Sequence, residues 1–306
     1  MLVRAALRRD GPAADIGPGV AMTETPEFAP DIAGALNWAR ARIAVIDARI
    51  LLRHVLQCSA ARLAAYPEAQ LEEREWGEFR SLVERREAGE PVAYLIGERE
   101  FYGRSFMVGP AVLIPRPDTE LLIELALAHF GDKPRTRVLD LGTGSGALAV
   151  TLALELADAD VTAVDRSREA LLVAMANAAR LKASVSFVLG DWFSQLGGDR
   201  YQLIVANPPY VAADDLHLSE GDVRFEPGTA LAAGPQGLDD LAAIAAEAPR
   251  HLEAGGWLFM EHGYDQAAAV RGLLTDAGFS SIASWKDLGG IERVSGGQWQ
   301  GRGEPR

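Results

Sequence analysis

The sequence is poor in residues that mark several classes of protein. Among its 306 residues Cys58 is the single cysteine, so no internal disulfide can form, as is usual in a reducing cytosol. No apolar run approaches the ~18–20 residues that a membrane-spanning helix needs. The five histidines are not spaced as metal-ligand pairs, and no G-x-S-x-G hydrolase motif occurs. We therefore expect a cytoplasmic protein without a metal site or a hydrolase triad.

Positive charge is also scarce. The chain has 30 Lys and Arg against 43 Asp and Glu, a formal net charge of −13, and an isoelectric point of about 4.9. Proteins that act on nucleic acid usually carry a basic face, so we expect no direct nucleic-acid binding, although a local basic patch stays compatible with this balance. Hydrophobic residues make up 48% of the chain, enough for one large domain and one small domain.

The first 115 residues fall into three predicted parts. Residues 1–21 contain arginines but no continuous apolar segment, and we interpret them as a disordered extension rather than a secretory signal. Residues 22–89 predict a helical domain in which Pro67 separates two helical stretches. The apolar residues at helical spacing there are Ile46, Ile50, Val55 and Leu56, and then Trp76, Phe79, Leu82 and Val83. Residues 90–115, rich in Gly, Pro and aromatics, predict a hairpin connector.

The large domain is predicted at residues 116–306, where strands and helices alternate from Arg137 onward. The predicted strands are 137–141, 160–164, 185–189, 203–206, 257–261, 281–285 and 292–295. The predicted helices are 147–156, 168–181, 238–252 and 265–277. Such alternation predicts an α/β fold with a doubly wound, largely parallel sheet.

A glycine-rich turn follows the first strand of this domain. Its residues are Gly142, Thr143, Gly144, Ser145 and Gly146, and a helix comes next. Glycines let a ligand approach the backbone closely, and ligands of parallel sheets bind at the carboxyl ends of the strands. The spacing is G-x-G-x-G and not the G-x-G-x-x-G of dinucleotide sites, so the turn indicates a nucleotide-like ligand without naming it. A tight turn without a ligand is the alternative.

Polar residues at the next two strand ends strengthen the ligand interpretation. Asp165 closes the second strand, where its carboxylate could accept both hydroxyls of a ribose. It could also cap the helix that follows, and an NAD site would place an acid there too. Asp191 could accept from an adenine amine and Trp192 could pack on the ring, whereas we assign Phe193 to the core.

Asn207, Pro208, Pro209 and Tyr210 follow the fourth strand. Two prolines fix the backbone and remove two N–H donors, which leaves carbonyl oxygens, the Asn207 side chain and an aromatic ring. This set suits a planar –NH2 group, with Asn207 Oδ1 and the Pro208 carbonyl accepting its hydrogens while Tyr210 stacks on it. Two acceptors would orient a weakly nucleophilic amide nitrogen and stabilise the positive charge that develops during alkylation. A rigid Pro-Pro turn without chemistry is the alternative.

With these motifs placed, residues 31–296 resemble the bacterial release factor glutamine methyltransferases, the PrmC/HemK family. The segments that carry the resemblance are residues 90–97, 99–103, 113–120 and 221–227, together with the glycine turn and the Asn-Pro-Pro-Tyr segment. The resemblance implies a seven-stranded class I methyltransferase domain after a small helical domain and a hairpin.

The resemblance also implies roles for the predicted site residues. Residues 142–146, Asp165, Asp191 and Trp192 would hold S-adenosylmethionine, which leaves as S-adenosylhomocysteine. Asn207 would touch both ligands, and with Pro208, Pro209 and Tyr210 it would hold the glutamine of a release factor Gly-Gly-Gln loop. The chain would act as a monomer on a protein substrate, which the helical domain at residues 22–89 would help to dock. Its own Gly296-Gly297-Gln298 is interpreted as a chance tripeptide.

Three alternatives stay open at this point. A sister family methylates glutamine on a large-subunit ribosomal protein, although residues 115–120 and Asp191-Trp192 look like the release factor branch. A nucleic-acid amino methyltransferase would present the same kind of acceptor loop to a base. A non-catalytic binding protein could keep the scaffold without the activity.

Overall fold

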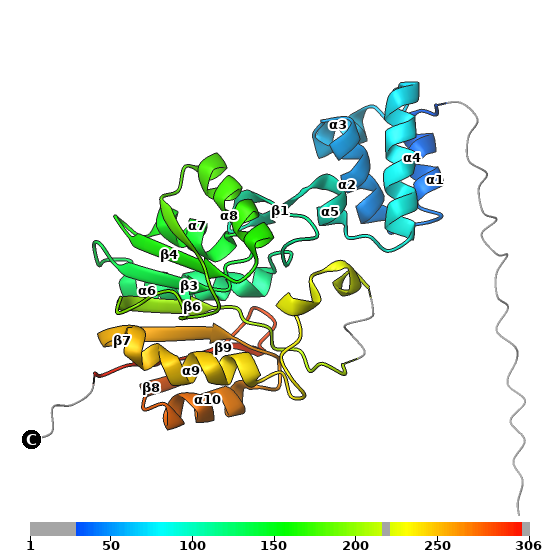
Figure 1. The fold of residues 1–306 in the computed structure, drawn as a ribbon. Coiled ribbons are helices and arrows are strands. Elements are labelled where there is room, and N and C mark those ends of the chain that lie inside the picture. Colours follow the sequence, from blue (N-terminus) through cyan, green and yellow to red (C-terminus); the bar gives the residue numbers. More distant parts are fainter. Residues whose placement is uncertain (1–28, 216–220, 302–306) are drawn as a thin grey trace, which may run out of the picture. The chain divides into compact units, whose positions relative to one another are not determined.

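The computed structural model describes residues 29–215 and 221–301, so the predicted extension at residues 1–21 lies outside the described residues. The chain divides into two compact units, the first ending at Glu87 and the second beginning at Ala88 (Figure 1). In the described part of the chain, no helix combines the length and apolar character needed to cross a membrane.

The first unit is helical, as predicted. Its helices are α1 (Ile32–Ala39), α2 (Val45–Val55), α3 (Ala60–Ala65) and α4 (Glu73–Glu87). Asp31 caps α1 by accepting from the Gly34 N–H at 2.7 Å, and Ser59 caps α3 in the same way. The core centres on Trp38 and Trp76, whose ring centroids lie 4.9 Å apart in an edge-to-face arrangement.

The apolar residues whose spacing predicted the helices form the buried face of α4 but not that of α2. The four residues predicted for α4 are all buried. In α2 the buried residues are instead Ala48, Leu51 and Leu52, whereas Ile46 is 62% exposed and Ile50 only half-buried. Both sets have helical spacing, and α2 packs its Ala48–Leu52 side against α1 and α4. Periodicity identified the helix, but packing selected the face.

This correction predicts different costs for two substitutions in α2. Leu51→Ala removes a fully buried side chain and should lower the free energy of unfolding by ~2–5 kcal/mol. Ile46→Ala removes an exposed one and should change it by less than about 0.5 kcal/mol. Urea unfolding followed by tryptophan fluorescence measures both, and equal losses would contradict the assigned face.

The second unit begins with a short helix and the predicted hairpin. These elements are α5 (Val92–Ile96), β1 (Glu98–Phe101) and β2 (Arg104–Met107). Tyr102 and Gly103 form the two-residue turn, both at positive φ, as hairpin turns of this length require. Helix α5 was not predicted because five residues between Pro91 and Gly97 are too few to show periodicity. Helix α6 (Glu120–Phe130), also not predicted, is apolar on most of its surface.

Within the described residues the sheet has seven strands in the order β5-β4-β3-β6-β7-β9-β8, and β9 runs in the direction opposite to the other six. The strands are β3 (Arg137–Leu141), β4 (Asp160–Asp165), β5 (Val185–Leu189), β6 (Tyr201–Ala206), β7 (Leu252–Glu261), β8 (Ser280–Lys286) and β9 (Glu292–Gln298). This confirms the doubly wound, seven-stranded fold. Strands β4, β6, β7, β8 and β9 are longer than predicted.

Helices cover both faces of the sheet (Figure 1). Their bounds are α7 (Ala147–Glu155), α8 (Arg168–Leu181), α9 (Asp239–His251) and α10 (Ala267–Asp276). Residues of α6, α7 and α8 form one buried cluster against the sheet, and residues of α9 and α10 form the other. With both faces covered, the strand ends are the part of the sheet left to build a site.

The Gly296-Gly297-Gln298 tripeptide lies inside β9, between β7 and β8. A Cβ at Gly296 would come within 2.4 Å of the Phe259 ring, so glycine is required there for packing. Gln298 donates through Nε2 to the Gly255 carbonyl at 3.0 Å. These contacts give the tripeptide a structural role, and they support its interpretation as a chance match to an acceptor loop.

Candidate active site

The predicted site residues meet at the carboxyl-terminal ends of the sheet strands. The glycine turn follows β3, Asp165 ends β4, Asp191 and Trp192 follow β5, and Asn207 follows β6. The pairing register aligns these ends, because Leu141 of β3 lies opposite Val164 of β4 and Ala206 of β6. A cavity opens there and is lined by Gly142, Thr143, Gly144, Ser145, Asp165, Asp191, Trp192, Asn207 and Pro209.

The three glycines of the turn have separate roles, and all have positive φ. A Cβ at Gly142 would meet the Trp192 ring at 3.2 Å, and one at Gly146 would meet Ala174 of α8 at 3.0 Å. A Cβ at Gly144 would meet nothing within 4 Å, so this backbone faces open space. Gly146 itself does not line the cavity; it allows α7 and α8 to pack closely.

Asp140, the penultimate residue of β3, holds the glycine turn in place through two hydrogen bonds. Its Oδ2 accepts from the Thr143 hydroxyl at 2.6 Å and from the Ala149 N–H at 3.2 Å. The side chain is fully buried, and its Oδ1 has no hydrogen-bond partner among the described residues. Burial raises the pKa of Asp140 to about 7, against the lowering effect of the two hydrogen bonds.

The acid at the end of β4 ties the turn to the next helix. Asp165 Oδ2 accepts from the Gly144 N–H at 2.9 Å, and Oδ1 accepts from the Ser167 N–H at 2.8 Å. Ser167, and not Asp165, caps α8, since its hydroxyl accepts from the Ala170 N–H. Each Asp165 oxygen still has lone-pair capacity for a ligand hydroxyl.

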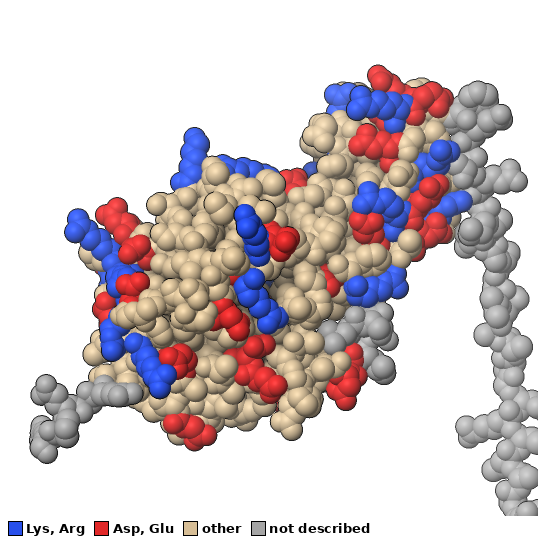
Figure 2. All heavy atoms as spheres, in the orientation of Figure 1, with Lys and Arg blue, Asp and Glu red and all other residues tan. Residues whose placement is uncertain are grey.

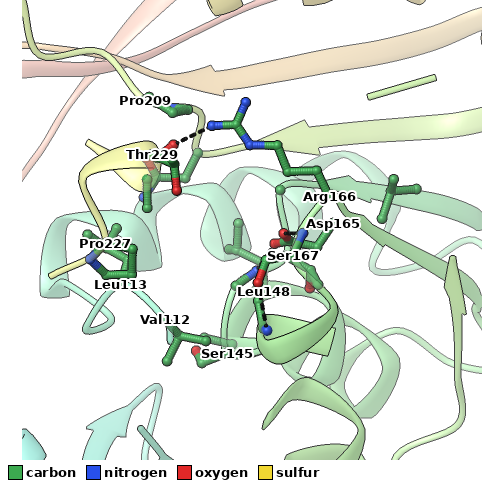
Figure 3. Close-up of a pocket in the computed structure, with 18 of the residues that line it drawn as sticks. Val112, Leu113, Ser145, Leu148, Asp165, Arg166, Ser167, Pro209, Pro227 and Thr229 are labelled. Atoms are coloured by element: carbon green, nitrogen blue, oxygen red, sulfur yellow. Dashed lines mark hydrogen bonds between the residues drawn. The ribbon is translucent and has the colours of Figure 1, made fainter. Parts of the chain in front are cut away.

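Trp192 and Arg166 form two further parts of the cavity wall. Trp192 sits at positive φ, and its Nε1 donates to Asp240 Oδ1 at 3.2 Å. Arg166 reaches across to the Thr229 carbonyl, 2.9 Å from Nη2 (Figure 3). As expected, Phe193 belongs to the core, where it stacks on His251.

A second cavity adjoins the first and contains the other half of the Asn-Pro-Pro-Tyr segment. It is lined by Leu113, Arg116, Asn207, Pro208, Tyr210, Val211, Val223, Ala230 and Leu231. Asn207 lines both cavities, whereas Pro209 lines the first and Pro208 and Tyr210 line the second. The segment therefore separates two spaces that meet at one carboxamide.

Buried groups behind this segment hold it in place. Asn207 Nδ2 donates to Thr119 Oγ1 at 3.1 Å, and the Tyr210 hydroxyl donates to Glu261 Oε1 at 3.0 Å. Gln266 Nε2 donates to the Tyr210 carbonyl at 2.9 Å. Burial raises the pKa of Glu261 to about 7, with the Thr119 and Tyr210 hydroxyls opposing the shift.

An ion pair closes the second cavity on another side. Arg116 pairs with Glu226, whose side chain is fully buried. The other Glu226 oxygen, Oε2, accepts from the Ile114 N–H at 2.9 Å. Burial raises the pKa of Glu226, and the Arg116 guanidinium counteracts that shift. The two segments that carry the family resemblance, residues 113–120 and 221–227, are thus joined.

Several site residues were not predicted from the sequence. No role was predicted for Arg166, Thr119 or Glu261. Glu261 had a usable signal, because it ends β7 at the same end of the sheet as the predicted residues. Thr119 belongs to residues 113–120, which carry part of the family resemblance, but nothing local linked it to Asn207, since it precedes the first strand of the sheet by 18 positions in the chain.

The raised pKa of Asp140 predicts a pH dependence of stability. Between pH 5 and pH 7 the native Asp140 holds a proton that the unfolded chain has lost, so the free energy of unfolding falls as pH rises toward the folded pKa of about 7. Asp140→Asn should flatten this fall by roughly 3 kcal/mol, about 1.36 kcal/mol for each pH unit below the folded pKa. Urea unfolding at both pH values measures the difference, and the slope that persists should come from Glu261. An unchanged slope would show that Asp140 titrates normally.

Comparison with known proteins places the chain in a family. The model described as PrmC N-terminal domain matches residues 34–97, and that described as methyltransferase small domain matches residues 118–222. The chain is 53% identical to the release factor glutamine methyltransferase of Bordetella pertussis over 253 residues, 82% of this chain and 94% of that protein. It is 49% identical to that of Yersinia pestis over 254 residues, 83% and 91% of the two chains.

Solved structures at lower identity share the fold. The T. Thermophilus 16S rRNA N2 G1207 methyltransferase (RsmC) superposes with a TM-score of 0.50 at 22% identity, covering 66% of this chain and 49% of that one. The hMettl16 catalytic domain gives 0.51 at 15% identity, covering 75% and 83%. Similarity over most of the chain and the shared motifs lead to one conclusion: the chain belongs to the release factor glutamine methyltransferase family.

Proposed function

We propose that the chain transfers a methyl group from S-adenosylmethionine to N5 of the glutamine in the Gly-Gly-Gln motif of peptide-chain release factors. The observation that carries the proposal is the position of Asn207, which lines both adjoining cavities. A group that touches a donor space and an acceptor space can align the two reactants. Family membership supports the identity of the acceptor.

The first cavity fits the proposed cofactor. Gly144 presents backbone to open space, and Asp165 keeps lone pairs free for ribose hydroxyls. Val112, Leu113 and Leu148 provide apolar wall (Figure 3). Trp192 also lines the cavity and provides a flat ring. Asp191 also lines this cavity, where it would accept from the adenine amine. When bound, S-adenosylmethionine supplies an electrophilic methyl group on a sulfonium.

The second cavity fits a carboxamide. Asn207 Nδ2 donates a hydrogen bond to Thr119 Oγ1, so Asn207 Oδ1 is left to accept one N–H of the substrate amide. The Pro208 carbonyl accepts the other, and Tyr210 packs against the flat face. These acceptors orient the nitrogen and stabilise the positive charge that develops on it, so the proton can leave after the new C–N bond has formed. No strong base is needed in this order of events.

The surface charge of the described residues favours a protein substrate over nucleic acid. On the face in Figure 2, Lys and Arg side chains are interspersed with Asp and Glu, and the described residues seen there form no continuous basic band. Proteins that track a phosphate backbone gather positive charge along one face. A net charge of −13 points the same way.

The decisive experiment uses the full chain with S-adenosylmethionine and a purified release factor, followed by peptide mass spectrometry. We expect a 14 Da (about one CH2) increase on the Gly-Gly-Gln glutamine. The large-subunit ribosomal protein and RNA are tested in parallel. Faster modification of either would assign the chain to one of the alternative functions, and no modification of any would favour a binding protein.

Asn207→Ala should abolish most of the transfer. Losing one preorganised partner of the reacting nitrogen should lower kcat by about 10²–10³-fold. Cofactor affinity, measured by calorimetry, should stay nearly unchanged because Asp165 and the glycine turn are intact. An equal loss of both would indicate misfolding instead.

Asp165→Ala should weaken the binding of S-adenosylmethionine. A lost hydrogen bond to a charged acceptor is worth about 1.5–3 kcal/mol, or roughly a 10–150-fold rise in Kd. Asp160→Ala is the matched control, because Asp160 starts the same strand at the opposite edge and makes only an exposed ion pair with Arg137. A large fall in melting temperature with unchanged affinity would reduce Asp165 to a structural role.

A further inference from the structure

A chain of buried polar groups runs from Asn207 into the protein interior. Asn207 Nδ2 donates to Thr119 Oγ1, and the Thr119 hydroxyl neighbours the Glu261 carboxylate. Thr119 is 5% exposed and Glu261 1%, so water does not compete at either group. Glu261 also accepts from the Tyr210 hydroxyl, so one carboxylate contacts Tyr210 directly and lies beside Thr119, the partner of Asn207.

We propose that Thr119 and Glu261 are positioning residues that fix which end of the Asn207 carboxamide faces the acceptor, a role that rests on the proposed function. A carboxamide has an acceptor end and a donor end of nearly the same shape. Only the acceptor end, Oδ1, can bind the N–H of a substrate amide. A carboxamide turned by 180° would present Nδ2 and place two donors against each other.

The direction of the hydrogen bonds follows from the carboxylate. A threonine hydroxyl has one proton to donate and lone pairs to accept with. The Thr119 oxygen accepts from Asn207 Nδ2, so the Thr119 proton points elsewhere, and Glu261 is the neighbouring acceptor. Above its pKa of about 7 the Glu261 carboxylate is ionised and can only accept, so in that state it draws the Thr119 proton toward itself. The Tyr210 proton is drawn to the same group. Each hydrogen bond in the chain from Glu261 to Asn207 then has one possible direction. As a result, the Asn207 carboxamide presents Oδ1 to the substrate.

Glu261 lies close to other charged groups that balance it. Arg293 lowers its pKa, and Asp118 raises it. Arg293 is itself shared, lying 3.1 Å from Asp287 and 3.7 Å from Asp118. The second oxygen, Oε2, has no hydrogen-bond partner among the described residues. Burying a carboxylate with one oxygen unpartnered lowers the stability of the folded protein. Such a group is expected where a function, rather than stability, requires it.

Three variants test the proposal. Thr119→Val keeps the shape and removes the hydroxyl, and it should lower kcat by roughly 10–100-fold, less than a full loss of the Asn207 partner. Glu261→Gln adds a donor that can reverse the chain and should lower kcat similarly. The KM for S-adenosylmethionine should stay near the wild-type value in both. Thr119→Ser retains the hydroxyl and should keep a kcat close to wild type.

Thr151→Val is the matched control, because Thr151 is equally buried in α7, lines neither cavity, and has a hydroxyl without a hydrogen-bond partner in the described structure. It should leave kcat unchanged. Wild-type kcat in Thr119→Val, or an equal loss in Thr119→Ser, would overturn the positioning role, since the first shows the hydroxyl to be unnecessary and the second shows it to be insufficient.

The orientation has a readout that needs no acceptor protein. In selectively 15N-labelled protein, the Asn207 side-chain amide protons should exchange slowly with solvent in the wild type and in Thr119→Ser. They should exchange faster in Thr119→Val. Unchanged exchange in Thr119→Val would contradict the proposed orientation of Asn207, even if methyl transfer by that variant is slow. Slow exchange in the wild type together with no methylation of any release factor would reject the proposed function and leave the orientation intact.

Discussion

In-register parallel pairing is the interaction on which the rest of this site depends. Leu141 in β3 lies opposite both Val164 and Ala206, so the residues that follow in each strand leave the sheet side by side. A slip of one residue in either pair would turn Asp165 or Asn207 to the other face. The two cavities share Asn207 because this register holds.

Buried carboxylates at the same edge oppose the stability of the fold. Asp140 and Glu261 each have one oxygen without a hydrogen-bond partner among the described residues, and burial raises the pKa of both to about 7. Asp140 holds the glycine turn, and Glu261 holds the acceptor segment. A sequence selected for stability alone would replace such groups with apolar ones, so their presence fits a site that requires fixed acceptors.

The segment before the sheet builds one wall of the acceptor space. Arg116 pairs with the buried Glu226, which also accepts from the Ile114 N–H, so a loop before α6 is tied to one after β6. On the other side, Asn177 of α8 bonds to both the Met107 carbonyl and the Ser145 carbonyl. The hairpin and the glycine turn are therefore positioned by one side chain.

Local chemistry let the sequence by itself determine the strands of the sheet, the helices α7 to α10, the glycine turn and the Asn-Pro-Pro-Tyr segment, but not α6. Apolar periodicity, positive-φ glycines and prolines act within a few residues, and the strands β3 and β5 and the helix α8 have their predicted bounds. Tertiary structure alone decided the buried face of α2, the burial of Gly296 between two strands, and the meeting of Thr119 with Asn207. Those outcomes depend on side chains that are far apart in the chain, 88 residues for Thr119 and Asn207, and no local pattern records which distant partner will arrive.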